Sequence, residues 1–330
     1  MKFATIHLDG RSSPVVETQG GRLLPLTRID PTWTSLRRLI EAGEPALAAV
    51  RRALEADHAT VGMDEVRWAP PIPDPSKMLF VSLNNAAIDH HLTYRPDFPT
   101  YFPKLPSALI GAGETLRLQA HHGLTHPEPE LGVVIGRVAR EVPLGRGMDC
   151  VFGFTIVNDI TSVGMRKEDY LLGEYPMPDG DGTYRMVEES YLYPGRYKNV
   201  DGFCPMGPFV WHKDVVPDPM NIDVKAWLDD ELVIEDNTRN LHYSLDEVIY
   251  WMSHHSTLLP GDVISLGTAV DPDLRGKPLS YANLNRSGDV VRVDFEGLGS
   301  LRTPVQRVQA GVDPRLHFAQ SKRFVPRSLG

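Results

Sequence analysis

The stretch that decides the fold is Glu128-Pro129-Glu130-Leu131-Gly132-Val133-Val134-Ile135-Gly136, in which two glutamates stand at the head of an apolar run. A short apolar run of this kind is consistent with a buried β-strand. Successive side chains of a strand point to opposite faces, so residues two apart share a face. We therefore expect Glu128 and Glu130 to direct their carboxylates to the same side.

A second apolar run, Val151 to Val157, ends on Asn158-Asp159. If the two runs are neighbouring strands, Asp159 joins the two glutamates. Three converging carboxylates repel one another, and it is costly to keep them ionised without a cation. Glu128, Glu130 and Asp159 are thus predicted to bind a divalent metal, Mg²⁺ first, with Mn²⁺ or Ca²⁺ as alternatives. The simpler alternative is that both glutamates are solvated charges before an edge strand.

The composition is that of an ordinary globular protein. The chain has 330 residues, of which 42% are hydrophobic and 23% charged, so it is long enough for one large domain or two. A net charge of −9 argues against nucleic acid or an anionic membrane as a partner, because either would be repelled. An anionic small molecule remains compatible, since a metal and a few basic residues reverse the local field.

Cysteine usage and the N-terminus indicate a cytoplasmic protein. Cys150 and Cys204 are the only cysteines, which offers no disulfide framework and fits a reducing compartment. Residues 1–7 lack a long apolar signal core. No stretch approaches the roughly 20 apolar residues that a membrane span needs.

Two regions follow one another along the chain. Residues 1–70 form the expected small N-terminal α+β domain, with short strands in residues 1–30 and a helix within 32–56. The proline-rich segment 69–75 favours extended backbone and marks the boundary. Residues 71–330 form the expected catalytic domain. Many short strands without regular βα alternation favour an α+β, mainly β fold with a rolled mixed sheet.

Local patterns predict several elements of this second region. Asp229-Asp230 is a turn signal between two strands of a hairpin. Ser244-Leu245-Asp246-Glu247 has the form of a capping box that opens a helix. The remaining expected strands are residues 78–83, 263–266 and 289–295.

Six segments, spread over roughly residues 75–305, resemble the fumarylacetoacetate hydrolase family in order and in kind. Two of them are the apolar runs with their carboxylates. The other four are Phe102–Ala108 (F-x-K-x-P-S-A), Lys198–Pro208 (K-x-x-D-x-F-x-P-x-G-P), Asp236-Asn237-Thr238 (the N-T turn) and Pro260–Thr268 (P-G-D-x-I-x-x-G-T). Each match is weak alone, but six in sequence indicate membership of the family.

The resemblance implies a mixed β-roll catalytic domain, a homodimer and a divalent metal, usually Mg²⁺. It also implies a 2-oxo acid or 1,3-dicarbonyl substrate and the stabilisation of an enol or enolate by the metal. We expect hydrolysis of a C–C bond in an acylpyruvate-like substrate, as in the catabolism of aromatic compounds or sugar acids. Isomerisation, decarboxylation or hydration of a related 2-oxo acid is the alternative, because the fold does not determine the reaction. A non-catalytic binder of metal and 2-oxo acid is the alternative from another class.

The same resemblance assigns roles to three further residues. Lys198 matches the lysine beside the metal, where its ammonium pairs with an anionic oxygen of the substrate. Thr268 matches the threonine whose hydroxyl holds the substrate carboxylate. Arg166 is the nearest candidate for an arginine that family members carry shortly after the aspartate, where this chain has Val163.

The catalytic base departs from the family pattern N-Y-x-x-H-x-x-E. Here Asn85 replaces the tyrosine, the histidine arrives two residues late as His90, and Thr93 stands where the partner glutamate is expected. Histidine suits the role because its ordinary pKa is near neutral. We expect His90 to be the base, with His91 as the alternative.

A second departure is the long stretch between Asp159 and Lys198. Residues 163–197 form a lid-like insertion, and the tyrosine-rich part from Tyr175 to Tyr197 is expected to pack over the site. The other histidines lack a metal-binding pattern and are interpreted as surface or core residues; they are His121, His122, His126, His254 and His255.

Overall fold

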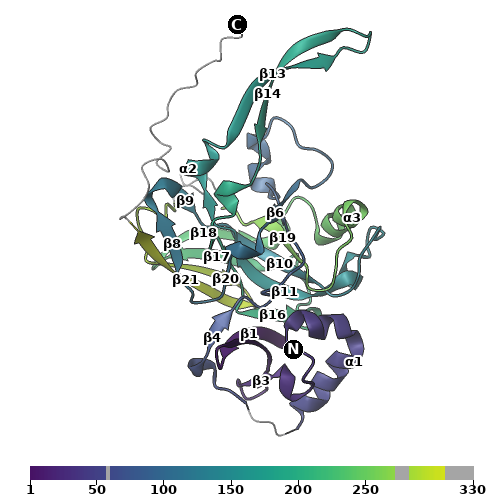
Figure 1. The fold of residues 1–330 in the computed structure, drawn as a ribbon, viewed down its shortest axis with the longest axis vertical. Coiled ribbons are helices and arrows are strands. Elements are labelled where there is room, and N and C mark those ends of the chain that lie inside the picture. The colour runs from purple at the N-terminus through teal and green to yellow at the C-terminus, as the bar shows by residue number, and fades with distance from the viewer. Residues whose placement is uncertain (57–59, 272–281, 309–330) are drawn as a thin grey trace.

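The computed structural model describes residues 1–330 except 57–59, 272–281 and 309–330. Strands dominate the body, in a ten-stranded mixed sheet and a five-stranded sheet, with short helices around them (Figure 1). This is the α+β, mainly β architecture that the sequence predicts.

The larger sheet contains β1 (Lys2–Leu8), β2 (Arg11–Glu17), β3 (Leu23–Pro25), β4 (Arg67–Ala69), β5 (Met78–Val81), β6 (Tyr101–Lys104), β10 (Pro129–Ile135), β11 (Val151–Asn158), β16 (Phe209–His212) and β19 (Val263–Thr268). The five-stranded sheet contains β8 (Leu116–Gln119), β17 (Asp223–Leu228), β18 (Glu231–Asn237), β20 (Val290–Phe295) and β21 (Gly299–Val308). Three further pairs are β7 (Leu109–Ile110) with β15 (Cys204–Pro205), β9 (Thr125–His126) with β12 (Thr161–Ser162), and β13 (Tyr170–Pro178) with β14 (Tyr184–Leu192). The α-helices are α1 (Leu36–Leu54), α2 (Val163–Arg166) and α3 (Leu245–His255).

The two apolar runs form β10 and β11, which pair antiparallel near the middle of the larger sheet. Alternate residues of β10 pack into different cores. Leu131 and Val133 join the core shared with the five-stranded sheet, whereas Val134 joins the core beneath α1. Gly132 is required by close packing, because a Cβ there would lie 2.8 Å from the methyl groups of Thr155 and Val157. Burial on both faces fixes the register of the strand.

The N-terminal segment adds strands to the same sheet. β1 pairs with β16, with Phe3 opposite Val210, so the sheet continues across the proposed domain boundary near residue 70. The helix predicted within residues 32–56 is α1. It is kinked at Gly43, whose φ of 67° suits a residue without a side chain.

The local predictions for the second region are confirmed. β17 and β18 form the hairpin around Asp229, which has a positive φ of 53°. Ser244 and Glu247 make the reciprocal contacts of a capping box at the start of α3. The predicted strands are β5, β19 and β20.

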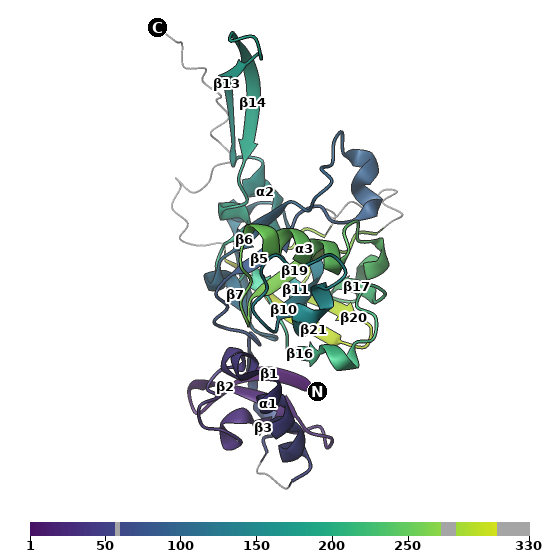
Figure 2. The same cartoon turned by 90° about the vertical axis from the view of Figure 1, so that its right-hand side faces the viewer.

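A long antiparallel hairpin projects from the body. β13 and β14 pair over their whole length, from Tyr170 opposite Leu192 to Pro178 opposite Tyr184. Two views at right angles show this hairpin extending away from both sheets (Figures 1 and 2). We refer to residues 170–192 as the β-arm. No helix within the described ranges is long and apolar enough to span a bilayer.

Candidate active site

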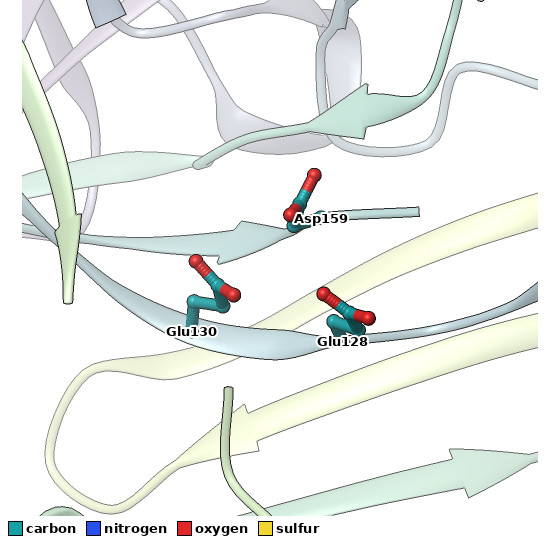
Figure 3. A group of neighbouring side chains, drawn as sticks. All are labelled: Glu128, Glu130 and Asp159. Carbon is teal, nitrogen blue, oxygen red and sulfur yellow. The ribbon is translucent and has the colours of Figure 1, made fainter. Parts of the chain in front are cut away.

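Three carboxylates meet where β10 begins and β11 ends. Glu128 and Glu130 flank the first residue of β10 and lie on the same side of the sheet (Figure 3). Asp159 follows β11, and the pairing of Pro129 with Asn158 places it beside them. One oxygen from each carboxylate lies within 4.8 Å of the others. The structure thus brings together the three residues predicted as metal ligands, all of them buried.

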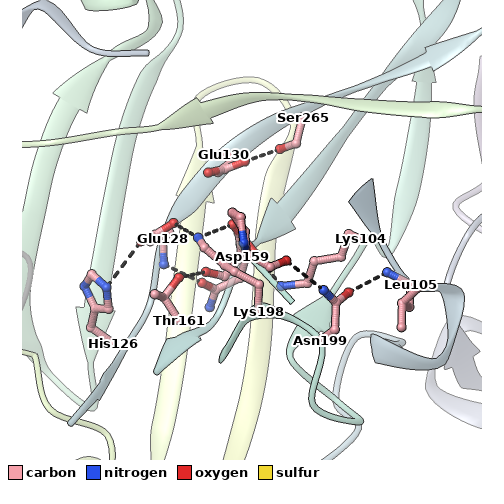
Figure 4. Close-up of polar contacts among 12 residues, drawn as sticks. Lys104, Leu105, His126, Glu128, Glu130, Asp159, Thr161, Lys198, Asn199 and Ser265 are labelled. Carbon is pink, nitrogen blue, oxygen red and sulfur yellow. Dashed lines mark hydrogen bonds and ion pairs between the residues drawn. The ribbon is translucent and has the colours of Figure 1, made fainter. Parts of the chain in front are cut away.

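Two buried lysines enter this carboxylate group (Figure 4). Lys198 Nζ donates hydrogen bonds of 2.6 Å to Glu128 Oε2 and 2.5 Å to Asp159 Oδ2. Lys104, the last residue of β6, donates from Nζ to Asp159 Oδ1. The position of Lys198 beside the carboxylates agrees with the family resemblance. Lys104 lay within a matched segment, but sequence reasoning gave it no role.

The neighbouring charges shift the ionisation of the group. Burial, Asp159 and Glu128 together raise the pKa of Glu130 well above its ordinary value. Burial also opposes ionisation of Glu128, but Lys198 and His126 outweigh it and hold the pKa of Glu128 below its ordinary value. Burial disfavours the Lys198 ammonium, yet Asp159 and Glu128 raise the pKa of Lys198 overall. Glu130 is therefore the carboxylate whose charge is least compensated.

These residues fit a hard divalent cation. All three candidate ligands offer oxygen, which Mg²⁺ and Mn²⁺ prefer, and the uncompensated charge of Glu130 is what a cation would stabilise. With both lysines charged, the three ionised carboxylates leave the group with a formal charge of −1. A bound divalent cation would reverse that sign and favour an anionic ligand.

Two more residues hold the carboxylates in place. Ser265 on β19 donates from its hydroxyl to Glu130 Oε2. His126, buried at the end of β9, has Nε2 at 3.2 Å from Glu128 Oε1. The interpretation of His126 as a surface or core histidine missed this contact with a proposed ligand. The sequence did contain a signal for this contact, because His126 stands two residues before Glu128.

His122 is a core histidine, one of the two placements predicted for it. The His122 ring is buried, and Nδ1 accepts a hydrogen bond from the backbone of Gln119. Burial, with a smaller contribution from His121, lowers the pKa of His122 to about 4. His122 is thus neutral at physiological pH.

The two candidate bases lie on an exposed 3₁₀ helix, Ala86–His91, after β5. The rings of His90 and His91 contact each other, with centroids 3.9 Å apart. In the part of the chain that the structure describes, neither ring makes a hydrogen bond or ion pair with the three carboxylates. The role of His90 as base stays a prediction.

The two predicted substrate-binding residues are placed differently. Thr268 ends β19 directly opposite Glu130, and its hydroxyl donates to the carbonyl of Ala269 at 3.0 Å. It therefore lies beside the carboxylate group. Arg166 ends α2 with an exposed side chain, and its substrate role stays a prediction.

The two strands of the lid-like insertion project from the body in this structure. Residues 163–197 form α2, the β-arm and the turn that carries Lys198, and the tyrosine-rich strands are exposed. Arg196 Nη2 lies 2.6 Å from Asp169 Oδ1 and closes the base of the β-arm. The role of the insertion as a lid stays a prediction, and Tyr197, at its end, is buried beside Lys198.

A sequence profile of the fumarylacetoacetate (FAA) hydrolase C-terminal family matches residues 80–306, more than half of the chain. The chain belongs to the fumarylacetoacetate hydrolase family. The family match includes all three carboxylates, both lysines and the strands that carry them.

Curated relatives from the fumarylacetoacetate hydrolase family include the mitochondrial oxaloacetate tautomerase of Xenopus laevis. It is 29% identical over 294 residues, which cover 87% of this chain and 83% of the relative. A human mitochondrial oxaloacetate tautomerase is also 29% identical, over 91% of this chain and 88% of the relative.

Solved structures of the family share the fold. Maleylpyruvate hydrolase from Sphingobium sp. SYK-6, in complex with manganese(II) and pyruvate, is 25% identical, with a TM-score of 0.69. The match covers 94% of this chain and 100% of that chain. Fumarylacetoacetate hydrolase from Exiguobacterium antarcticum is 26% identical, also with a TM-score of 0.69, over 93% of this chain and 100% of that chain. This chain is thus similar to hydrolases and tautomerases alike, and it is an enzyme of this family.

Proposed function

We propose that this enzyme catalyses the keto–enol tautomerisation of a 2-oxo dicarboxylic acid of the oxaloacetate type, with a divalent cation as cofactor. The observation that carries the proposal is the Lys198 ammonium, held charged and buried among three carboxylates. Curated relatives that match most of the chain at 29% identity are named oxaloacetate tautomerases. The sequence also lacks the partner glutamate that would orient a water-activating histidine, since Thr93 occupies its position.

Glu128, Glu130 and Asp159 would hold the cation. When bound, it would supply Lewis-acid stabilisation of negative charge on a substrate oxygen. Ser265 and His126 would keep the glutamates oriented, and Lys104 would do the same for Asp159.

The chain's own residues account for the proton movements that tautomerisation needs. A proton leaves carbon 3 of the keto acid while the oxygen on carbon 2 gains negative charge and then a proton. Lys198 is placed to pair with that oxygen, and a fixed ammonium in a buried site stabilises such charge strongly. We propose His90 as the base that accepts the carbon-bound proton and then returns it to the oxygen on carbon 2. No water molecule is consumed.

The second candidate is C–C bond hydrolysis of an acylpyruvate. The specific observation in its favour is the likeness to maleylpyruvate hydrolase, whose solved structure contains manganese and pyruvate. The same ammonium would stabilise a pyruvate enolate as it leaves. This reaction also needs an activated water, and that is where the sequence departs from the family pattern.

The deciding experiment compares both reactions on one metal-stripped preparation resupplied with Mg²⁺ or Mn²⁺. Loss of enol-oxaloacetate absorbance reports tautomerisation, and pyruvate release from an acylpyruvate reports hydrolysis. We expect the metal to accelerate tautomerisation, and we expect no hydrolysis of the acylpyruvate. Pyruvate release without tautomerisation would favour the second candidate instead. Glu130→Ala should abolish the activity, and Glu55→Ala, at an exposed glutamate beyond α1, is the matched control.

A further inference from the structure

Tyr197 is buried directly beside the carboxylate group. It precedes Lys198 in the 3₁₀ turn Arg196–Lys198, which packs against β12 and against α2. β12 closely follows Asp159, and α2 ends at Arg166. Only 4% of Tyr197 is exposed. The turn thus places a buried phenol next to both the carboxylate group and the end of α2.

The hydroxyl of Tyr197 makes no hydrogen bond in the part of the chain that the structure describes. Buried polar groups are as a rule hydrogen-bonded, because an unpaired one loses its contact with water without compensation. A phenylalanine would fill the same space without this cost. An unpaired phenol beside the site therefore indicates a hydroxyl that serves a ligand.

The charges around this hydroxyl favour an anionic ligand. Burial raises the pKa of Tyr197, so the phenol stays neutral and keeps a proton to donate. Lys198 and Arg166 oppose this rise in pKa, and each has a larger influence on it than Glu128 or Asp159 has. The hydroxyl thus lies where positive charge predominates, and a carboxylate is a suitable acceptor for its hydrogen bond.

The substrate class under Proposed function carries two carboxylates, and the present inference rests on that proposed function. When Lys198 pairs with the oxygen on carbon 2, the distal carboxylate begins only two bonds away, at carbon 4. Its donor must therefore come from the immediate surroundings of Lys198. Arg196, on the other side of Tyr197 in the turn, already pairs with Asp169 at 2.6 Å. The hydroxyl of Tyr197 is the neighbouring donor that is available.

We propose that Tyr197 determines substrate specificity, because its hydroxyl donates a hydrogen bond to the distal carboxylate of the 2-oxo dicarboxylic acid. Arg166 adds attraction for that carboxylate from the end of α2. A 2-oxo acid without a second carboxylate gains nothing from this hydroxyl. Tyr197 thus distinguishes acids of the oxaloacetate type from acids of the pyruvate type, and it takes no part in the proton transfer.

Binding of two ligands tests this role in the full-length protein loaded with Mn²⁺. The difluoro analogue of oxaloacetate keeps both carboxylates, but fluorine replaces both hydrogens on carbon 3, so it cannot tautomerise. Pyruvate lacks the distal carboxylate. Titration calorimetry gives the dissociation constant of each ligand for the wild type, for Tyr197→Phe and for Tyr193→Phe. Tyr193, an exposed tyrosine shortly before the turn, provides the matched control.

We expect Tyr197→Phe to raise the dissociation constant of the difluoro analogue at least about tenfold, because a hydrogen bond to a charged group is lost. The dissociation constant of pyruvate should stay unchanged, and Tyr193→Phe should change neither value. Circular dichroism checks that each variant is folded.

Three results would each overturn the proposal: a wild type that binds both ligands equally well, a Tyr197→Phe protein that binds the analogue as tightly as the wild type, and an equal rise for both ligands. The last result would mean that Tyr197 only supports the turn that carries Lys198. The reaction is tested separately. A wild type that binds the analogue through Tyr197 but does not tautomerise oxaloacetate would refute the proposed function and support the role of Tyr197.

Discussion

The Asn85 amide donates a 2.8 Å hydrogen bond from Nδ2 to the Asp236 carboxylate. The same carboxylate oxygen accepts a 2.7 Å hydrogen bond from the backbone of Val270. Asp236 therefore connects the segment that follows β5, which carries His90, to the segment that follows β19, the strand that ends at Thr268. Asn85, the residue that departs from the family pattern, contributes to this connection instead of to water activation.

Asp236→Asn should destabilise the protein. The carboxylate is buried and accepts hydrogen bonds from Asn85, Val270 and Asn240, and an amide cannot accept all of them. We expect a loss of about 1–3 kcal/mol in the free energy of unfolding, measured by urea denaturation. Asp230→Asn, at an exposed residue of the β17–β18 turn, should change it little. Equal losses in both variants would contradict the connecting role of Asp236.

Replacement of any of the three carboxylates by alanine should weaken metal binding and activity together. Each would remove one of the proposed oxygen ligands, and we expect the affinity for Mg²⁺ or Mn²⁺ to fall by more than the roughly 10–100-fold typical of supporting residues. Titration calorimetry with Mn²⁺ measures the affinity, and the metal content of the purified protein provides a second readout. Glu130→Ala protein with the metal content of the wild type would refute the assignment.

In metal-free protein, Glu130→Gln should increase stability at neutral and alkaline pH. Glu130 has a raised pKa in the folded state, because burial and then Asp159 and Glu128 oppose its charge. The stability that its proton contributes is complete below the ordinary glutamate pKa and is lost as pH rises through the folded-state pKa. The unfolding free energies of the wild type and of the Glu130→Gln variant, measured with a chelator from pH 4 to 9, should therefore diverge as pH increases. The variant should be the more stable of the two. A wild type that is as stable as the variant at pH 9 would exclude this explanation.

His90→Ala should lower kcat by about 10²–10⁴ while metal affinity is unchanged, as expected for the loss of a general base. His91→Ala should have a much smaller effect, which makes it the matched control. The acidic limb of kcat against pH should disappear in the first variant only, because protonation of a histidine base abolishes its action. If the His90→Ala protein retains full activity and the same acidic limb, another group removes the proton.

Local sequence patterns predicted much of the fold. The capping box at Ser244 and the turn at Asp229 depend on side chains a few residues apart, so both could be predicted from the sequence. The β-arm could not be. Its strands contain Pro176 and Pro178 and make few contacts with the body, so no apolar alternation facing the core revealed them.

The site, too, has features that follow from local sequence and features that follow only from the tertiary structure. The sequence alone determined that Glu128 and Glu130 share a face, because the period of a strand depends on no other part of the chain. Only the tertiary structure decided that Lys104 and Ser265 contact the carboxylates, and that His126 lies nearer to them than His90 does in this conformation. These contacts join residues from different strands. They are set by the order and register of β6, β10 and β19 in the larger sheet and by the pairing of β9 with β12, which burial and strand pairing determine.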